Sequence, residues 1–344
     1  MRFLFLYIIL FLQNAALHSQ TLGGSSAYTF LKLPSTSILT ATGGVNTSYI
    51  TNDIGFALNN PALLKSGMHG QFSASFNGYF SGIQAYNMAG GYYDAPSQTT
   101  FGANIFFINY GQITQTDAAG NISGDFHPVD YAVQLSAAKK YLEKWHYGLS
   151  LKYINSHYGQ YQSSAIAFDM GVLYHDSAQN FSASIVAKNM GVPIKSYAAT
   201  KEDLPFDLQI GVTKKLTKAP LAFSLTAYHI HQFDLIYNDT AFNTDNNFAS
   251  HHSAITNILN HLVLATHIYI SPHLEAHIGY NFLRRSELNL GSSGNGLNGF
   301  SAGFAAKFQK LQVQYARAYF QKNIAYNQFG LIIPLDKLFG LNSL

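Results

Sequence analysis

Histidine is the residue type that most directly suggests chemistry in this chain. The sequence holds 14 histidines, and His229 and His231 lie two apart, on one face if their segment is a strand. Zinc normally needs three or four converging ligands, often with Cys or carboxylate groups among them. The other histidines add no helpful spacing, and this pair lies near the expected end of a strand, where histidine is tolerated at a membrane interface. We therefore expect no metal site and no cofactor.

Serine catalysis and phosphate binding are the other chemistries that the residue types allow. A catalytic triad is a spatial arrangement, and we expect no nucleophile elbow of the Gly-x-Ser-x-Gly type. Gly294-Asn295-Gly296 lacks the strand and helix that frame a phosphate-binding loop. Lys139, Lys140 and Lys144 cluster on a predicted turn, where lysines contact lipid headgroups. The sequence thus predicts a protein that is not an enzyme.

The composition favours a membrane-spanning β-barrel. Charged residues make up 11% of the 344 residues and aromatic residues 15%, whereas about a quarter of a soluble protein is charged. Mean hydropathy is +0.02, and after the amino terminus no apolar run reaches the roughly 18 residues of a helical span. The net charge of +3 is small and its Lys and Arg are scattered, so we expect no nucleic-acid partner.

Residues 1–19 have the features of a secretory signal peptide. Arg2 supplies a positive charge, Phe3 to Leu12 form an apolar run, and Leu17-His18-Ser19 is a plausible cleavage site. Such a short run spans only about half of a bilayer as a helix, which argues against a membrane anchor. With no Cys, the chain has neither a lipoprotein anchor nor disulfides. We therefore expect an exported protein.

Stretches of alternating apolar and polar residues dominate the rest of the chain and predict the elements that would position any site. Most have the roughly ten residues that a tilted transmembrane strand needs. In Val129–Ser136, large apolar side chains alternate with small or polar ones. The predicted fold class is all-β: a transmembrane antiparallel β-barrel of about 14 strands over residues 70–333. The predicted strands are 70–77, 82–92, 99–109, 127–137, 145–157, 164–174, 180–190, 206–215, 220–231, 257–271, 273–283, 298–309, 311–319 and 324–333.

Charged residues within these strands indicate which face is the lumen. A charge on the lipid face costs about 2–4 kcal/mol at the bilayer midplane, so charges on the polar face must point inward. Arg317 shares a face with Val313 and Tyr315, and we expect it near an interface or a β-bulge. The register of residues 324–333 stays open, because apolar residues occupy both faces. The charges placed in the lumen are Asp130, Lys152, Asp169, Lys188, Asp207, Glu275 and Lys307.

Long and short connectors alternate along the chain. The long links 110–126, 191–205, 232–256 and 284–297 are rich in Gly, Asn, Asp and Ser. Outer-membrane barrels have short periplasmic turns and longer outer loops. We therefore expect an integral outer-membrane protein with surface loops and with both termini, including a tail at 334–344, in the periplasm. A soluble sandwich or solenoid would also alternate, but it would not confine long loops to one side.

Residues 20–69 break the strand pattern. Gly43-Gly44, Pro34 and Pro61 interrupt this segment, and Ala57–Leu64 has the character of a short helix or tight turn. Its apolar content is too high for a free tail. We therefore expect this segment to fold into the barrel as an N-terminal plug, with a periplasmic cap beneath the barrel as the alternative.

Several short motifs match a known family of barrels. Gly24–Pro34, Gly43-Gly44, Asn60-Pro61-Ala62 and, in the last strand, Gly330-Leu331 resemble the PorQ family, outer-membrane components of the type IX secretion system of Bacteroidetes. The Asn-Pro-Ala element is also similar to one in the wider group of PorV and the long-chain fatty-acid transporters. Such proteins often carry Ala-Arg after Pro-Ser, where this chain has Thr36-Ser37. Further matching motifs are Ile108–Gly111, Asp130–Ala132, Asp169–Gly171, Tyr174–Asp176, Lys188–Gly191 and Leu204–Phe206.

This resemblance implies a non-catalytic scaffold of the type IX attachment complex. Proteins of this family hold a PorZ-like surface protein, in one complex with a PorU-like sortase and a PorV-like barrel. The complex removes the carboxy-terminal signal domain of secreted cargo and attaches the cargo to anionic lipopolysaccharide. The implied partners are these three proteins and the outer-membrane lipid, and Asn60-Pro61-Ala62 is the implied plug motif.

The outer loops are the expected partner-binding surface, above all residues 232–256 and 284–297. Exposed apolar side chains in a loop often mark an interface, although packing over the barrel mouth would explain them equally well. The apolar residues are Phe233, Leu235, Ile236, Tyr237 and Phe242.

Two alternative functions have different signatures. A channel for hydrophobic molecules, similar to the fatty-acid transporters, needs a continuous apolar path and a lateral opening. A surface lipid-modifying enzyme needs converging Ser, His and acidic groups. The charges expected in the lumen favour the scaffold over the channel.

Overall fold

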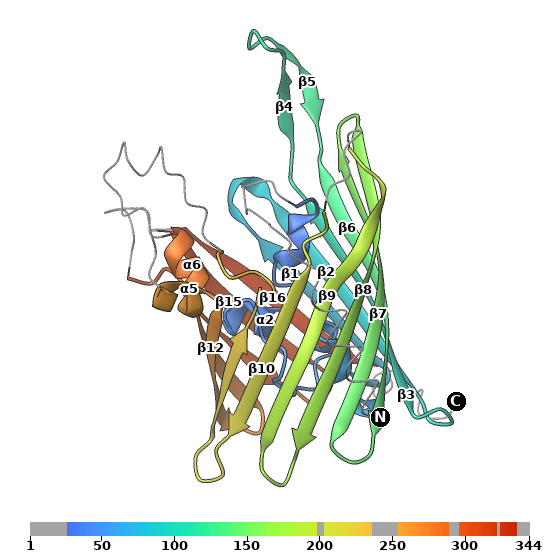
Figure 1. Cartoon of the computed structure of the whole chain (residues 1–344), viewed down its shortest axis with the longest axis vertical. Coiled ribbons are helices and arrows are strands. Elements are labelled where there is room, and N and C mark those ends of the chain that lie inside the picture. Colours follow the sequence, from blue (N-terminus) through green and yellow to red (C-terminus); the bar gives the residue numbers. More distant parts are fainter. Residues whose placement is uncertain (1–25, 198–202, 236–253, 289–295, 322–323, 336–344) are drawn as a thin grey trace, which may run out of the picture.

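A computed structural model describes residues 26–197, 203–235, 254–288, 296–321 and 324–335. Fourteen strands form one closed barrel, in the order β1-β16-β15-β14-β13-β12-β11-β10-β9-β8-β7-β6-β3-β2. Every neighbouring pair is antiparallel, and a separate hairpin, β4–β5, projects from the barrel (Figure 1). The predicted transmembrane barrel of 14 strands is confirmed. The predicted signal peptide, residues 1–19, and most of the predicted tail, residues 336–344, lie outside the described residues.

The strands of the barrel run from residue 71 to residue 334. Their bounds are β1 (Gln71–Gly78), β2 (Gln84–Asp94), β3 (Thr99–Asn109), β6 (Val129–Tyr141), β7 (Trp145–Tyr158), β8 (Tyr161–Asp176), β9 (Phe181–Lys195), β10 (Asp207–Lys215), β11 (Leu221–Ala227), β12 (Leu262–Ser271), β13 (Leu274–Asn281), β14 (Phe300–Lys307), β15 (Gln312–Gln321) and β16 (Ile324–Pro334).

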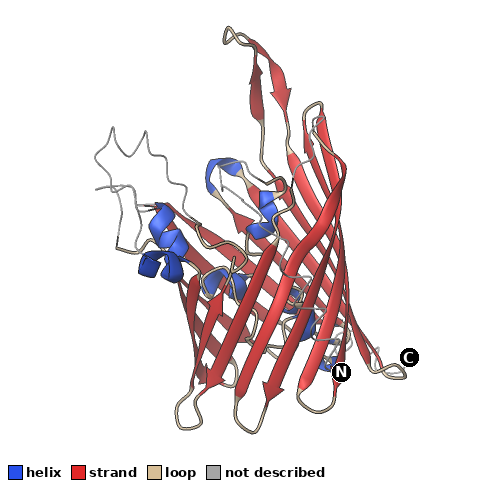
Figure 2. Cartoon of the chain, in the orientation of Figure 1, coloured by secondary structure: helices blue, strands red, loops and turns tan. Residues whose placement is uncertain are grey.

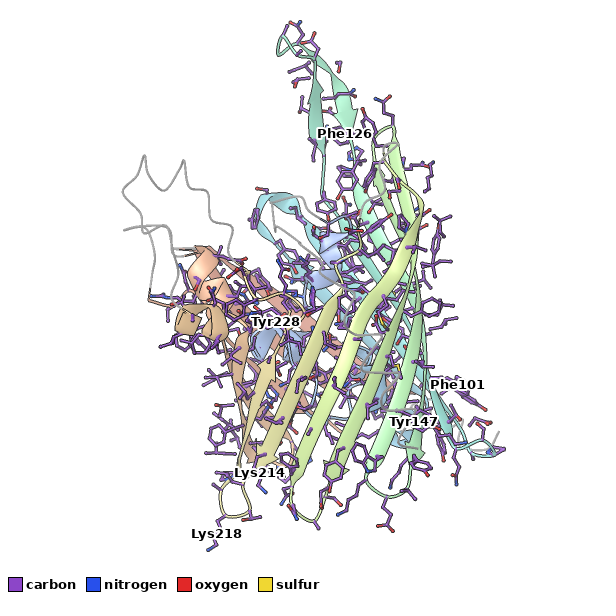
Figure 3. All side chains as sticks on the ribbon, viewed as in Figure 1. Phe101, Phe126, Tyr147, Lys214, Lys218 and Tyr228 are labelled. Carbon is purple, nitrogen blue, oxygen red and sulfur yellow. The ribbon has the colours of Figure 1, made fainter. Side chains whose placement is uncertain are left out.

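The apolar residues of the alternating pattern lie on the outer face of the barrel, and the polar residues lie on the inner face. On β6, Leu135 is 59% exposed on the outer face, while Gln134 and Ser136 are buried on the inner face. Phe101 and Tyr147 likewise project outward (Figure 3). Because lipid covers this band, its apolar side chains need no protein partner. The inward placement of charges is confirmed for four buried residues, Asp130, Lys152, Asp169 and Asp207, and Lys188, Glu275 and Lys307 are partly buried.

The first and last strands close the barrel. β1 pairs with β16 from Gln71 opposite Pro334 to Gly78 opposite Asn327, which settles the register that the sequence left open. The pairing of β15 with β16 shifts after Tyr319, so a bulge does lie close to Arg317. Arg317 itself is exposed, and its guanidinium donates a 3.1 Å hydrogen bond to Asn327.

The two ends of the barrel differ. At one end, here the turn end, connectors such as 142–144, 216–220 and 272–273 have at most five residues. At the other, here the hairpin end, the chain carries the β4–β5 hairpin and the two helices α5 (Ala254–Asn260) and α6 (Phe282–Leu288). Lys214 and Lys218 lie at the turn end (Figure 3). The predicted one-sided distribution of long links therefore holds.

The wall is higher on one side. Strands β6 to β9 have 13 to 16 residues, whereas β10 to β14 have 7 to 10. In Figure 1 the long strands rise past the level of α5 and α6, which lie beside the shorter ones. The opening of the hairpin end is therefore oblique.

Several predicted boundaries are wrong. The strand predicted at 220–231 ends at Ala227, because the backbone turns at His229, which has a φ of 54°. Residues 257–260, predicted as strand, belong to α5, and residues 282–283 begin α6. Both errors arise where a strand leaves the membrane, since the hydrogen bonds within a helix then satisfy the backbone as well as hydrogen bonds between strands do.

The link 110–126 contains two strands that were predicted as loop. β4 (Ile113–Thr116) and β5 (Ile122–Phe126) form a hairpin whose tip is held by Asp117. The Asp117 carboxylate accepts hydrogen bonds from the backbone N–H of Ala119 at 2.9 Å and of Asn121 at 2.8 Å. The side-chain hydrogen bond from Asn121 is the main reason why the pKa of Asp117 is lowered.

The N-terminal segment, defined here as residues 26–69, contains five short helical elements. They are η2 (Thr29–Lys32), α2 (Ser37–Ala41), α3 (Ile54–Ala57), η3 (Pro61–Leu63) and η4 (Ser66–Met68). Figure 2 shows them in blue among the red wall strands, apart from α5 and α6 at the rim. In the described part of the chain, no helix has both the length and the apolar character needed to cross a membrane.

Candidate functional site

The Asn60-Pro61-Ala62 motif lies in the barrel, fully buried, against β6, β7 and β8. Asn60 caps η3: its side-chain oxygen accepts from the Ala62 N–H at 3.1 Å, and Pro61 occupies the first turn, where no N–H is needed. The Asn60 amide also donates to the Thr47 carbonyl at 2.8 Å. The motif therefore makes a compact corner that ties two parts of the N-terminal segment together.

Glycines in the wall make room for this corner. A Cβ on Gly148 of β7 would lie 2.4 Å from the Pro61 carbonyl carbon, and one on Gly171 of β8 would lie 2.1 Å from the Asn60 side-chain oxygen. Neither distance is possible for a real side chain. The backbone of Pro61 and the side chain of Asn60 thus touch the backbone of the wall, which only glycine allows.

A second contact joins residues 46–48 to β9 and β10. Ser184 donates to the Thr47 carbonyl at 2.8 Å, and Ser182 donates to the Ser48 carbonyl at 2.7 Å. The hydroxyls of Ser48 and Thr213 lie 2.8 Å apart. Small hydroxyl side chains on the inner face thus satisfy the backbone of a buried turn, as buried polar groups require.

A third contact joins α2 and α3 to β13–β16. Asp53 is buried and caps α3 by accepting from the Gly55 N–H at 2.9 Å, while Gln314 of β15 donates to its second oxygen at 3.0 Å. Thr40 of α2 donates to the side chain of Gln328 of β16. The N-terminal segment is therefore bonded to the wall on several sides of the lumen.

Charged groups fill part of the remaining lumen. Lys152 and Asp169 form a buried ion pair with an N–O distance of 2.6 Å, and Lys152 also donates to Asn189 at 2.9 Å. Lys188 donates to the Asn59 side chain of the N-terminal segment at 2.5 Å. Breaking such a buried pair from one side is costly, so these groups act as fixed polar anchors.

A cavity of about 250 Å³ lies at the hairpin end, between the N-terminal segment, β9, β10, the two residues that follow β11, and α6. Apolar side chains such as Leu31, Leu39 and Val45 form part of its lining. Charged or ionisable side chains form much of the rest, so it suits a polar or charged occupant better than a hydrocarbon. They are Lys32, Lys188, Asp207, His229, Arg284 and Glu287.

A second, more open cavity of about 350 Å³ lies beside Asp130 and is rimmed by tyrosines. Tyr110 and Tyr158 both donate to the same Asp130 oxygen, at 2.6 and 3.0 Å. Burial, followed by the hydrogen bond to Asp130, raises the pKa of Tyr110 above its usual range. Tyr110 thus stays a hydrogen-bond donor, which makes this a structural network.

The predicted partner-binding loop is described only in part. Phe233 is 59% exposed, but Leu235 packs against a cluster at the barrel mouth, so the two predicted residues differ in role. Ile236, Tyr237 and Phe242 lie outside the described residues. The sequence did not single out Ile255, at the end of this loop, or Ile258, just after it, although both are exposed on α5.

The structure corrects two expectations about chemical motifs. The expectation of no Gly-x-Ser-x-Gly motif is wrong, because Gly299-Phe300-Ser301-Ala302-Gly303 has that pattern. It is not a nucleophile elbow, since Ser301 is a buried wall residue of β14 that donates to the Ala41 carbonyl at 3.2 Å. The prediction that His229 and His231 share a strand face is wrong, because both follow the end of β11. The structure brings Asp207, from the start of β10, next to them.

The chain matches no family model and no curated protein. Among solved structures it is similar to a mutant of the monoaromatic hydrocarbon channel TodX, with a TM-score of 0.53, 11% identity and coverage of 87% of this chain and 97% of that one. It is also similar to the toluene transporter TbuX of Ralstonia pickettii, with a TM-score of 0.51, 10% identity and coverage of 88% and 98%. At such identities these similarities show the fold alone.

Proposed function

We propose that this barrel is a non-catalytic outer-membrane scaffold of the type IX attachment complex that anchors a PorZ-like surface protein. In that role it works beside a PorU-like sortase and a PorV-like barrel, which attach secreted cargo to the cell surface. The observation that carries the proposal is the lumen. It is occupied by a segment of the same chain, bonded to the wall on several sides through glycine contacts, hydroxyls and amides. The resemblance of the sequence motifs to the PorQ family supports the identity of the complex.

A barrel that anchors a partner must stay inserted and closed, and it needs an accessible surface beyond the membrane. The N-terminal segment serves the first need as a plug. For the second, the hairpin end carries the β4–β5 hairpin, the root of the 232–256 loop and α5. We place this end outside the cell, because the short turns at the other end are typical of the periplasmic side. β1 then begins and β16 then ends on the periplasmic side, whereas Ala27, near the start of the described chain, donates to the Asp203 carbonyl at the hairpin end at 3.0 Å. The two termini that we predicted in the periplasm lie outside the described residues.

The partner-binding surface begins at Phe233 and includes α5. Phe233, Ile255 and Ile258 are more than half exposed at the end that we place outside the membrane. Exposed apolar side chains of this kind often mark protein interfaces. The five apolar residues of the predicted loop belong to the same stretch of sequence, between β11 and α5.

Replacing residues 236–253 by a short Gly/Ser linker tests the anchoring role. We expect the barrel to insert and fold, because the described wall, α5 and Leu235 are left intact, but to lose the surface partner. The measurement is affinity purification of the tagged barrel from detergent-solubilised outer membranes, with mass spectrometry of the co-purifying proteins. Recovery of the PorZ-like protein at the wild-type level with the variant would refute the loop as its anchor.

A channel for hydrophobic molecules is the second candidate, favoured by the fold shared with two hydrocarbon channels. It requires a path for an apolar molecule through a lumen that here holds the Lys152–Asp169 pair. The same purification separates the two roles. A barrel recovered without protein partners but with bound lipid or hydrocarbon would favour the channel, and uptake of radiolabelled toluene into proteoliposomes would then measure it directly.

A further inference from the structure

We propose that Asp207, His229 and His231 bind one divalent transition-metal ion, such as zinc, at the hairpin end of the barrel. This inference does not depend on the proposed function. One ligand atom from each of the three residues lies within 4.8 Å of the other two. Two imidazoles and one carboxylate are a donor set that zinc and related ions accept readily, and with only one carboxylate oxygen ligand it suits calcium and magnesium poorly.

The three ligands come from two segments that the barrel holds side by side. Asp207 is the first residue of β10, and the two histidines follow β11, the next strand in the wall. His229 Nδ1 lies 3.2 Å from Asp207 Oδ1. Ligand atoms around tetrahedral zinc are about 3–3.5 Å apart, so this pair already has the required spacing, and a ligand atom of His231 lies within 4.8 Å of both.

The surroundings orient the ligands. Gln209 donates to Asp207 Oδ2 at 2.6 Å, and the His229 backbone N–H donates to Asp207 Oδ1 at 2.7 Å. The His231 ring stands edge-on to Phe206, with centroids 4.8 Å apart. His229 has a φ of 54°, a left-handed conformation that is uncommon for a residue with a side chain and is found preferentially at functional sites. Groups that hold metal ligands in this way commonly strengthen metal binding.

The charges around the site determine which kind of fourth ligand the metal ion would take. Asp207 and His229 line the 250 Å³ cavity, so a fourth ligand can enter from it. Lys32, Lys188 and Arg284 line the same cavity and oppose a cation, while Glu287 partly offsets them. This surplus of positive charge favours hydroxide or another anion as the fourth ligand. A bound ion would join the start of β10 to the root of the 232–256 loop and fix that root in place.

Cobalt and zinc titration of the full-length barrel tests the site. The protein is purified in detergent with an affinity tag free of histidine, stripped with a chelator, and titrated with Co²⁺ while visible absorption is recorded, then with Zn²⁺ by calorimetry. We expect one ion per chain, with cobalt bands that zinc abolishes. Asp207→Asn and His231→Ala should each lose this stoichiometric site, and Gln209→Leu should weaken it by about 10–100-fold.

The matched control is His127→Ala, because His127 is an exposed histidine at the same end but outside the cluster. It should bind as the wild type does. Circular dichroism of each variant shows whether the barrel is folded, and Asp207→Asn keeps the shape of the side chain in case His231→Ala does not fold. Absence of a stoichiometric ion in the wild type, or binding by folded Asp207→Asn equal to wild type, would overturn the proposal.

Discussion

At the residue scale, two wall glycines determine how closely the N-terminal segment approaches the barrel wall, because glycine has no Cβ. Gly148 and Gly171 bring the wall backbone against Asn60 and Pro61, where any Cβ would overlap with them. A core that depends on backbone contact cannot adjust by rotating a side chain, so a single methyl group must move the segment or the strand.

Gly148→Ala should therefore destabilise the barrel by about 1–3 kcal/mol, as overpacking of a core does. Gly67→Ala is the matched control, because its Cβ would meet nothing closer than Asn52 at 3.8 Å. In urea unfolding of the protein in lipid vesicles, followed by circular dichroism, the midpoint should fall for the first variant only. Equal midpoints for the two variants would show that the segment is not held by this contact.

The alternation of apolar and polar residues predicted which charged side chains lie in the lumen, but it did not predict how they contact other groups. Asp130, Lys152, Asp169 and Asp207 were placed in the lumen because a charge cannot face lipid, and they lie there. The approach of Asp207 to His229 could not be predicted, because it depends on how far β11 extends beyond its partner. His229 leaves the strand two residues after Ala227, a change that the histidine spacing does not reveal.

At the element scale, the β4–β5 hairpin is an addition to the barrel and not part of it. Ile113 and Ile122 are exposed, the latter to 75%, and the tip is closed by hydrogen bonds within the hairpin. Below it, the Tyr110 N–H donates to the Pro128 carbonyl at 3.1 Å, so the barrel strands are already joined beneath the hairpin.

Replacing residues 113–125 by a two-residue turn should therefore leave the thermal unfolding midpoint of the barrel unchanged. The measurement is circular dichroism in detergent, with the wild type as reference. A clear fall in the midpoint would mean that the hairpin stabilises the barrel, in conflict with its exposed side chains. The sequence predicted this link only as a loop, because two short strands that pair only with each other leave little alternation to detect. The short helices α5 and α6 at the rim likewise leave little periodic pattern.

At the scale of the whole molecule, the strand count and the closed sheet were predictable because lipid leaves a barrel few alternatives. The position of residues 26–69 was harder to predict: we expected a plug, but a periplasmic cap remained as an alternative. Their contacts are carried by serines, threonines and glycines of the inner face, residue types that are unremarkable in any strand. From the same contacts we expect the N-terminal segment to close the lumen.

Deleting residues 26–69 removes the atoms that fill the lumen beside β6–β10 and β13–β16, while the strand ladder from β1 to β16 stays complete. The single-channel conductance of the purified barrel in a planar bilayer should then rise several-fold above that of the wild type. The variant without residues 113–125 is the control, since it loses mass outside the lumen and should conduct as the wild type does. Equal conductance of the deletion variant and the wild type, with the barrel folded by circular dichroism, would mean that the segment does not close the pore. The lumen would then be either open already, which would strengthen the case for a channel, or blocked by other residues, which would not; the wild-type conductance separates the two.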